Sequence, residues 1–419
     1  MLLQKLYFLR KTLKQQWMKP QELEKLHKKR LRALIKHTYH NVIFYRKKWK
    51  SHGIRPEDIK EIKDLDKLPI IKRDEVIKNY NYFIAENYRH LYNLGKVTFK
   101  LTSGTYGTPM KMIFDERGED YSEAIYLRSL LSLGYDIRKP IAYYWYEPFK
   151  RKFYHQFNFL KKNFIPSQLD ETEQFKILQK INPEYICYFP SSLFSISKKM
   201  LKEGIEIKPK LIVTEGEILS KKMEHVIQKA FNAPVYDFYA TTETGITAWE
   251  CKEKNGYHIN SDNVIINLTE NGKEVSPGER GSIVMTSLMN YIFPLIRYEI
   301  GDIGISTDEK CSCGRALPLM RSVEGRTYDF SNRNQVTPKM LIDVIADIPS
   351  ISNFKFIING AKNTKVKITS IERLSKDDVN KIRRRIKSVL KGKVEIENVH
   401  KLQKESTGKI IMIETNKPF

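Results

Sequence analysis

A short polar loop at residues 101–109 is the first stretch whose composition could do chemistry. It reads Leu-Thr-Ser-Gly-Thr-Tyr-Gly-Thr-Pro and follows a predicted strand at 96–101. Backbone N–H groups and hydroxyls in such a loop can surround the oxygens of a polyphosphate. The loop is neither a Walker A loop nor a GxGxxG fingerprint, because no Gly-Lys-Ser/Thr follows it. Taken alone, it is equally compatible with an ordinary polar turn.

Three cysteines and a histidine form a second group. Cys251 and His258 lie close in sequence, and Cys311 and Cys313 form a Cys-x-Cys pair further along the chain. Three thiolates and an imidazole complete a tetrahedral zinc site and leave no position for water, so a zinc held here would join strands rather than catalyse. The alternative is that these are unrelated small core residues, since Cys-x-Cys is a weaker signal than Cys-x-x-Cys. Cys187, inside a β run, is expected in the core.

Four further stretches combine charges with turn residues. Residues 237–243 read Asp-Phe-Tyr-Ala-Thr-Thr-Glu, residues 297–302 read Arg-Tyr-Glu-Ile-Gly-Asp, residues 325–329 read Gly-Arg-Thr-Tyr-Asp, and residues 405–409 read Glu-Ser-Thr-Gly-Lys. Three of these stretches also have a purely structural interpretation. Glu243 could be a charge at a helix start and Asp302 a turn cap. Lys409 could be a solvated surface lysine.

The elements that must position these residues alternate between strand and helix from about residue 96 to 300. Apolar periodicity predicts strands at 96–101, 141–146, 185–189, 211–214 and 235–239, and helices at 119–133, 171–181 and 220–231. This alternation is typical of an α/β layered domain with a largely parallel sheet. After residue 270, turn signals such as Asn271-Gly272 and Pro277-Gly278 separate strands such as 281–286 and indicate a β-rich subdomain.

Beyond about residue 327 the pattern predicts a separate small α+β domain. Its expected helices lie at 338–346 and 375–391, and its expected strands at 353–359, 365–371, 394–400 and 409–414. The predicted fold class is therefore α/β, in two domains. A large multi-layer domain at 1–326 has mostly parallel sheets and the β-rich subdomain, and a small, mobile α+β domain occupies 327–419.

The positive charge of the chain is concentrated at its start. Residues 1–50 hold fifteen Lys and Arg against Glu22 and Glu24, a net +13 of the +24 of the whole sequence. Leucines at positions 2, 3, 6, 9 and 13 recur at helical spacing and predict a basic amphipathic helix within this basic helical segment. Such a helix either packs on the domain with its basic face in water, or lies on an anionic membrane surface or an acidic partner.

Composition narrows the class of protein. A 419-residue chain with 41% hydrophobic residues can bury a large core, which argues against a disordered protein. Its net charge predicts polyanionic surroundings such as nucleotides, nucleic acid or an acidic membrane face. Four cysteines cannot build a disulfide framework and favour the reducing cytoplasm. No apolar run reaches the roughly 18 residues that span a bilayer.

Taken in order, the polar loop and the charged stretches resemble the core motifs of the adenylate-forming superfamily, which includes acyl-CoA synthetases and luciferases. The motif Asp-x-Tyr-x-x-Thr-Glu at 237–243 most resembles that of the phenylacetate–coenzyme A ligase branch, which includes CapK-type relatives in capsule polysaccharide biosynthesis. The resemblance spans about residues 95–412. It implies ATP-dependent activation of a carboxylate as an acyl-adenylate with release of pyrophosphate, followed by transfer to a thiol such as coenzyme A, or to an amine or hydroxyl.

The resemblance also implies how ATP and Mg²⁺ would be bound. The β- and γ-phosphates would be held by Thr102, Ser103, Gly104, Thr105 and Gly107. The adenine-contacting segment would be Glu215, Gly216 and Glu217. In the stretch that begins at Asp237, Tyr239 would stack on adenine, Thr242 would contact the α-phosphate and Glu243 would bind Mg²⁺.

Three further roles follow from the resemblance. Asp302 would accept hydrogen bonds from both ribose hydroxyls, and Arg326 would contact ribose or phosphate near the domain junction. Lys409 would bridge the substrate carboxylate and the α-phosphate, two anions that a cation must bring together. Similar cysteines in relatives of this branch also support the zinc site.

Two rival functions stay open at this point. One is a zinc-stabilised, basic nucleic-acid-binding protein, which the interleaved aromatic and basic residues at 143–155 would suit. The other is a family member that binds nucleotide without turnover. The identity of the carboxylate and of the acyl acceptor does not follow from these residues.

Overall fold

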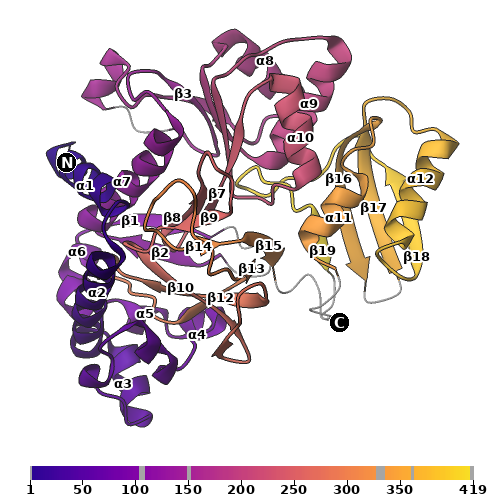
Figure 1. Ribbon diagram of the computed structural model, residues 1–419. Helices are drawn as coiled ribbons and strands as arrows, with labels where there is room; N and C mark the ends of the chain where they lie inside the picture. The colour runs from indigo at the N-terminus through magenta and orange to yellow at the C-terminus, as the bar shows by residue number, and fades with distance from the viewer. Residues whose placement is uncertain (1, 103–108, 149–151, 327–335, 360–362, 416–419) are drawn as a thin grey trace. The chain divides into compact units, whose positions relative to one another are not determined.

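The computed structural model describes residues 2–102, 109–148, 152–326, 336–359 and 363–415 (Figure 1). Contacts divide the chain into two compact units. The first unit comprises Met1–Leu133 and Phe238–Val323, and the second comprises Gly134–Asp237 and Glu324–Phe419. Each unit has an apolar core of its own. The expected domain boundary after residue 326 stays a prediction; in this structure residues from 324 onward pack with 134–237.

Helices of the first unit come mainly from the first third of the chain. They are α1 (Leu2–Gln15), α2 (Pro20–Asn41), α3 (Ile43–Ser51), α4 (Arg73–Lys78), α5 (Tyr80–Phe83), α6 (Arg89–Asn93) and α7 (Glu116–Leu133), with 3₁₀ turns at Pro56–Asp58, Ile62–Lys67 and Glu86–Tyr88. Pro20 at the first position of α2 fits a helix start, where a backbone N–H would have no partner. The predicted helix at 119–133 is confirmed as the main part of α7.

Strands of the first unit are mostly antiparallel. The hairpin β1 (Thr98–Leu101) and β2 (Lys111–Phe114) flanks the polar loop. One sheet has the order β11 (Lys273–Glu274), β10 (Val264–Glu270), β12 (Arg280–Ser287), β13 (Tyr298–Ile305), β15 (Ser322–Arg326), which is the expected β-rich subdomain. Another run has the order β14 (Leu319–Met320), β9 (Tyr257–Ile259), β8 (Gly245–Glu250), β7 (Val235–Thr241).

Parallel strands lie in the second unit, in the order β6 (Leu211–Glu215), β5 (Tyr185–Tyr188), β3 (Ile141–Trp145), β4 (Lys162–Pro166). Helix α8 (Glu171–Ile181) connects β4 to β5, and α9 (Pro190–Glu203) connects β5 to β6. Helix α10 (Lys221–Phe231) follows β6 and leads to β7. Asp170 accepts hydrogen bonds from the N–H groups of Thr172 and Glu173 and so caps α8. The α/β class is confirmed, but "mostly parallel" holds only for these strands, because hairpins reverse the chain direction after β7 and the sheets are mixed.

The described helices and strands between residues 338 and 415 form the expected α+β arrangement. The sheet order is β18 (Lys393–Asn398), β17 (Asn363–Ser370), β16 (Ile351–Asn359), β19 (Ile413–Thr415), with α11 (Pro338–Ile345) and α12 (Lys376–Lys387) beside it (Figure 1). Within the second unit this sheet packs on α9, where the Lys198 ammonium donates to the Ile348 carbonyl at 2.8 Å. The strand expected at 409–414 begins only at Ile413, so Lys409 lies in a loop.

The N-terminal helix α1 packs on α7, and the rings of Phe8 and Tyr121 meet edge to face at 5.3 Å. Its buried residues are Phe8, Leu9, Thr12 and Gln15. The expected apolar face is therefore only partly correct, because Leu3 and Leu6 lie on the outer side, with Leu3 84% exposed. None of the helices among the described residues is long and apolar enough to cross a membrane.

A buried ionic network lies beneath these helices. The Arg128 guanidinium of α7 donates to both carboxylate oxygens of Asp262, at 2.7 and 3.0 Å, and both side chains are fully buried. Tyr121 donates to the same carboxylate at 3.2 Å, and Arg30 of α2 reaches the Asp262 carbonyl. Burial opposes ionisation of Asp262, but the charge and hydrogen bonds of Arg128 outweigh it and lower the pKa of Asp262.

Candidate active site

Thr102 stands at the end of the hairpin strand that leads into the polar loop. Its hydroxyl accepts hydrogen bonds from the Met110 N–H and from the Arg73 guanidinium, both at 2.8 Å. Ser103, Gly104, Thr105 and Gly107 lie outside the described residues. Arg73 is not predicted from the sequence. It lies at the start of α4, about thirty positions before the loop, and no local pattern links it to residues 102–107.

Tyr239 and Asp302 meet in the first unit. The Tyr239 hydroxyl, at the end of β7, donates to the Asp302 carboxylate of β13 at 2.7 Å, and both residues are buried. The phenol therefore orients the carboxylate. The structure thus brings together the residue that the resemblance assigns to adenine and the residue that it assigns to ribose.

Thr242 and Glu243 lie in the turn between β7 and β8. Hydroxyls of Thr241, Thr244 and Thr247 contact one another across this turn at 2.7 to 3.1 Å and fix its shape. Glu243 is buried, whereas Thr242 is partly exposed. Because the turn joins two strands, the interpretation of Glu243 as a helix-start charge is wrong.

In the second unit, Glu215 ends β6, and Gly216 and Glu217 follow it. The Tyr143 hydroxyl of β3 donates to the Glu215 carboxylate. One strand over, Asp237 in β7 accepts a hydrogen bond from the Thr214 hydroxyl at 2.5 Å. Both carboxylates are buried and held in place by neighbouring strands.

Lys409 reaches this segment from its loop. Its Nζ lies 3.0 Å and its Cε 3.2 Å from the point where a Cβ on Gly216 would stand, and Gly216 has a φ of +81°. A side chain at position 216 would therefore displace the lysine as well as strain the backbone. The ammonium also lies 5.3 Å from the centre of the Phe189 ring. Lys409 is thus not a solvated surface lysine.

Electrostatics around Lys409 are mixed. Burial lowers the pKa of the Lys409 ammonium, while the carboxylates of Glu217, Glu405 and Glu215 act in the opposite direction and Arg326 adds to the lowering. Burial likewise raises the pKa of Glu217. Several residues of the predicted site therefore lie near Lys409 in the second unit: the carboxylates of Glu215 and Glu217, the guanidinium of Arg326, and Gly216.

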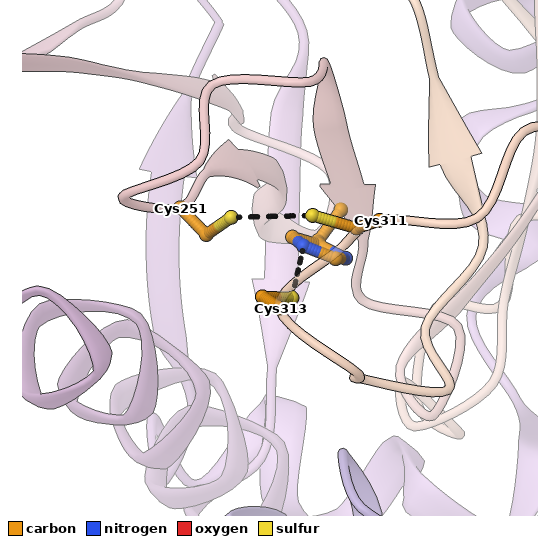
Figure 2. Close-up of side chains that lie close together, drawn as sticks. Cys251, Cys311 and Cys313 are labelled. Atoms are coloured by element: carbon orange, nitrogen blue, oxygen red, sulfur yellow. Dashed lines mark hydrogen bonds between the residues drawn. The ribbon is translucent and has the colours of Figure 1, made fainter.

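The predicted zinc ligands converge in the first unit. Figure 2 shows the Cys251, Cys311 and Cys313 side chains pointing toward one another. The thiols of Cys251 and Cys311 are 3.6 Å apart, and the Cys313 sulfur is 3.3 Å from His258 Nε2. All four ligand atoms lie within 4.8 Å of one another. β8, β9 and the loop before β14 bring these residues together from distant parts of the sequence.

The donor set fits a closed metal site. His258 is fully buried, and its Nδ1 lies 3.4 Å from the Leu317 carbonyl, which leaves Nε2 facing the sulfurs. Burial lowers the pKa of His258 to about 4, so the imidazole is neutral, the form that binds metal. Three sulfurs and one nitrogen in a buried cluster match the preference of zinc for tetrahedral sites.

Comparison with known proteins finds relatives by sequence and by structure. No family model matches the sequence. A phenylacetate–coenzyme A ligase of Thermus thermophilus is 24% identical over 345 residues, 79% of this chain and 77% of that protein. The phenylacetate–coenzyme A ligase of Escherichia coli is 26% identical over 74% of this chain and 72% of its own length. Protein CapK of Staphylococcus aureus is 23% identical over 74% and 69%.

Solved structures agree with these relatives on the fold. A 2-hydroxyisobutyryl-CoA ligase in complex with 2-HIB-AMP superposes with a TM-score of 0.80 over 96% of this chain and 91% of that one, at 17% identity. The Bacillus subtilis O-succinylbenzoate coenzyme A synthetase, in complex with ATP and magnesium, gives a TM-score of 0.52 over 75% and 68%, at 14% identity.

Fold and sequence similarity point the same way: the fold of this chain is that of acyl-CoA ligases of the adenylate-forming superfamily. Within that class, its homologues are the phenylacetate–coenzyme A ligases and CapK. The resemblance drawn from the sequence is confirmed at both levels.

Proposed function

We propose that this protein uses ATP to convert a small carboxylate into an acyl-adenylate and then passes the acyl group to coenzyme A. The observation that carries the proposal is the position of Lys409 against the Glu215–Glu217 segment. The homologues named as acid–coenzyme A ligases, and the structural neighbours that hold acyl-adenylates, support it.

In the first half-reaction a carboxylate oxygen attacks the α-phosphorus of ATP, and the bond to the β-phosphate oxygen breaks to release pyrophosphate. Two anions must approach each other, so the reaction needs cations placed in advance. Lys409 neutralises the attacking carboxylate and the α-phosphate. Tyr239 stacks on adenine, and Asp302, oriented by the Tyr239 hydroxyl, binds the ribose.

In the second half-reaction the coenzyme A sulfur attacks the acyl carbonyl carbon, and AMP leaves.

Further residues would bind the phosphates of ATP in the first half-reaction. Glu243 would bind Mg²⁺, which supplies further positive charge to the phosphates. Its side chain is buried beside Thr242, which would contact the α-phosphate. Thr102 and the loop after it would hold the β- and γ-phosphates, with Arg73 as an added cation at the loop's start.

Product analysis tests this function. Purified protein is incubated with ATP, Mg²⁺, coenzyme A and a panel of aromatic and aliphatic carboxylates, and AMP and acyl-CoA are quantified by mass spectrometry. We expect equal amounts of the two products with at least one acid. AMP without acyl-CoA would indicate another acceptor, and absence of both with every acid would support a nucleotide-binding protein without turnover.

We also propose that Cys251, His258, Cys311 and Cys313 bind one structural zinc. The convergence of four ligand atoms within 4.8 Å supports it. Such a zinc would bind β8 and β9 to the loop before β14 and would take no part in the chemistry. None of the four cysteines forms a disulfide, which suits the reducing cytoplasm as the place of action.

The outer face of α1 supports a peripheral contact with anionic membranes. Leu3, Leu6 and Tyr7 are exposed there, and Trp17 just beyond the helix is 53% exposed. Arg10 and Lys14 are exposed along the same stripe, which runs with helical spacing as Leu3, Leu6, Tyr7, Arg10, Lys14 and Trp17. Aliphatic and aromatic side chains between basic residues are typical of helices that lie in the membrane interface.

The rival nucleic-acid function was suited by the positive charge and by the aromatic and basic residues at 143–155. Two of those rings are not available for stacking on bases, because Tyr143 and Tyr144 are buried in β3. Tyr144 packs on the Tyr188 ring at 4.2 Å, and the Tyr143 hydroxyl holds Glu215. These two rings are part of the core.

A further inference from the structure

The Glu217 carboxylate holds two backbone segments that lie far apart in sequence. Its Oε1 accepts a hydrogen bond from the Ile410 N–H at 3.0 Å, and its Oε2 accepts one from the Ser191 N–H at 2.9 Å. Ser191 lies in the first turn of α9, a fourteen-residue helix whose positive dipole end favours a carboxylate. Ile410 directly follows Lys409, so Glu217 ties the Lys409 loop to α9.

A second set of contacts holds the same loop from its other side. The Ser167 hydroxyl donates to the Thr407 carbonyl at 2.7 Å, and the Gln168 amide donates to the Ser406 carbonyl at 3.1 Å. Gly408 has a φ of +84°, and a Cβ there would lie 2.3 Å from the Ser167 hydroxyl. The loop therefore fits closely between the segment after β4 and the segment after β6.

Inside the loop, hydrogen bonds make a compact turn. The Glu405 N–H donates to the Lys409 carbonyl, and the Gly408 N–H donates to the Glu405 carbonyl, both at 2.8 Å. A compact turn moves as one body. Holding the N–H of residue 410 therefore also fixes where the Lys409 ammonium lies, against Gly216 and the Phe189 ring.

We propose that Glu217 is a positioning residue for Lys409, which holds the lysine loop in the adenylating position. The proposal rests on the role given above to Lys409. It also assigns the Glu217 side chain a different task from adenine binding, because each of its oxygens already accepts a backbone N–H. The proposed function assigns Lys409 to the first half-reaction, so Glu217 is expected to serve that half-reaction.

Chemical labelling of Lys409 tests the contact without any need for activity. Wild type, Glu217→Gln and the control Glu203→Gln are treated briefly with a lysine-acylating reagent, and labelling at Lys409 is measured by peptide mass spectrometry. Glu203 is exposed on the same helix α9 and pairs only loosely with Lys199 at 3.9 Å. The glutamine at 217 presents an amide N–H to one of the two backbone donors, so one hydrogen bond is lost.

Loss of a hydrogen bond to a charged acceptor raises the population of the released loop about tenfold or more. We therefore expect about tenfold faster labelling of Lys409 in Glu217→Gln, with Glu203→Gln like wild type and with thermal unfolding showing a folded protein. Gly408→Ala, which displaces the loop from the Ser167 side, should raise labelling too. Unchanged labelling in a folded Glu217→Gln protein would overturn the proposal.

The two half-reactions give the second readout. In Glu217→Gln, pyrophosphate exchange should fall about tenfold or more with the KM for ATP unchanged, whereas coenzyme A transfer from preformed acyl-adenylate should proceed at the wild-type rate. An equal fall in both half-reactions would indicate general damage and would overturn the positioning role. If wild type shows no exchange with any carboxylate, the proposed function fails, and labelling alone still decides whether Glu217 holds the loop.

Discussion

Single residues explain why this site needs its particular side chains. Lys409 lies against a glycine because any side chain at position 216 would occupy its place. The Tyr239 phenol donates a hydrogen bond to the Asp302 carboxylate and orients it, so that the carboxylate can accept further hydrogen bonds from hydroxyl groups. Each arrangement involves one pair of residues, so a single substitution can test it.

The Tyr239 hydroxyl gives the first prediction. Tyr239→Phe keeps the ring that would stack on adenine and removes the hydroxyl that donates to Asp302. We expect the KM for ATP to rise roughly tenfold, with a smaller effect on kcat, because a hydrogen bond to a charged acceptor contributes about 1.5–3 kcal/mol. Steady-state kinetics with varied ATP measure this. A change confined to the carboxylate KM would contradict the assignment of this pair to the nucleotide.

At the scale of elements, two buried clusters fix how strands and helices meet. The cysteine–histidine group joins β8, β9 and the loop before β14, and the Arg128–Asp262 pair joins α7 to the chain segment before β10. Each cluster is a polar group within an apolar core, where an unpaired member is costly.

Zinc removal gives the second prediction. Purified protein should contain about one equivalent of zinc, and chelation or Cys311→Ser should lower the melting temperature by several degrees, because a structural zinc contributes folding free energy. Cys187→Ser, which changes a buried thiol outside the cluster, is the control for zinc content and should retain the metal. Protein never exposed to chelator that contains no zinc in metal analysis would contradict the site.

The ionic pair gives the third prediction. Asp262→Asn should destabilise the protein by about 3–5 kcal/mol at pH 7, because it leaves Arg128 buried without its counter-charge. Arg138→Met, which breaks the exposed pair with Asp136, should have a much smaller effect, because water screens an exposed ion pair. Urea unfolding of the three proteins measures both values. Equal losses for the buried and the exposed pair would contradict the account.

The same pair has a defined pH dependence. The pKa of Asp262 is lowered in the folded protein, so its contribution to stability is fully present above the unfolded pKa of about 3.9. It is lost as the pH falls through the lower folded value. The free energy of unfolding should therefore decline on acidification below about pH 4 more steeply in wild type than in Asp262→Asn.

For the whole molecule, the sequence predicts the succession of elements well. The helix at 171–181 and the strands after it occur where apolar periodicity and turn residues indicate them, because these signals are local. Lys409 and the cysteine cluster can also be proposed from the sequence. The order of the motifs indicates the lysine, and the residue types indicate the metal ligands.

Contacts between distant segments do not follow from the sequence. Arg73 beside Thr102, and Glu217 beside Ile410, depend on the tertiary fold, and neither pair has a fixed spacing. The predicted apolar face of α1 is only partly correct for a related reason. Its leucines satisfy helical periodicity, but which of them face α7 depends on packing with Phe8 and Tyr121.

The outer face of α1 gives the fourth prediction. Wild type should sediment with vesicles rich in phosphatidylglycerol and not with pure phosphatidylcholine. Arg10→Gln with Lys14→Gln should weaken this about thirtyfold, since each basic residue at a membrane surface contributes about 1 kcal/mol. Lys29→Gln with Lys36→Gln removes the same charge from exposed positions of α2 and should have a smaller effect. If the two double variants lose sedimentation equally, the attraction to the vesicles is non-specific. If neither double variant loses sedimentation, α1 has no role in membrane contact.

The central claim is that this protein forms acyl-adenylates with Lys409 as the cation between carboxylate and α-phosphate. Carboxylate-dependent exchange of labelled pyrophosphate into ATP measures that step directly. We predict exchange by wild type with at least one acid of the panel, and a fall of about 10²–10³-fold in Lys409→Ala with ATP binding retained. Exchange by Lys409→Ala at the wild-type rate would contradict the role of the lysine, and no carboxylate-dependent exchange by wild type would contradict the function itself.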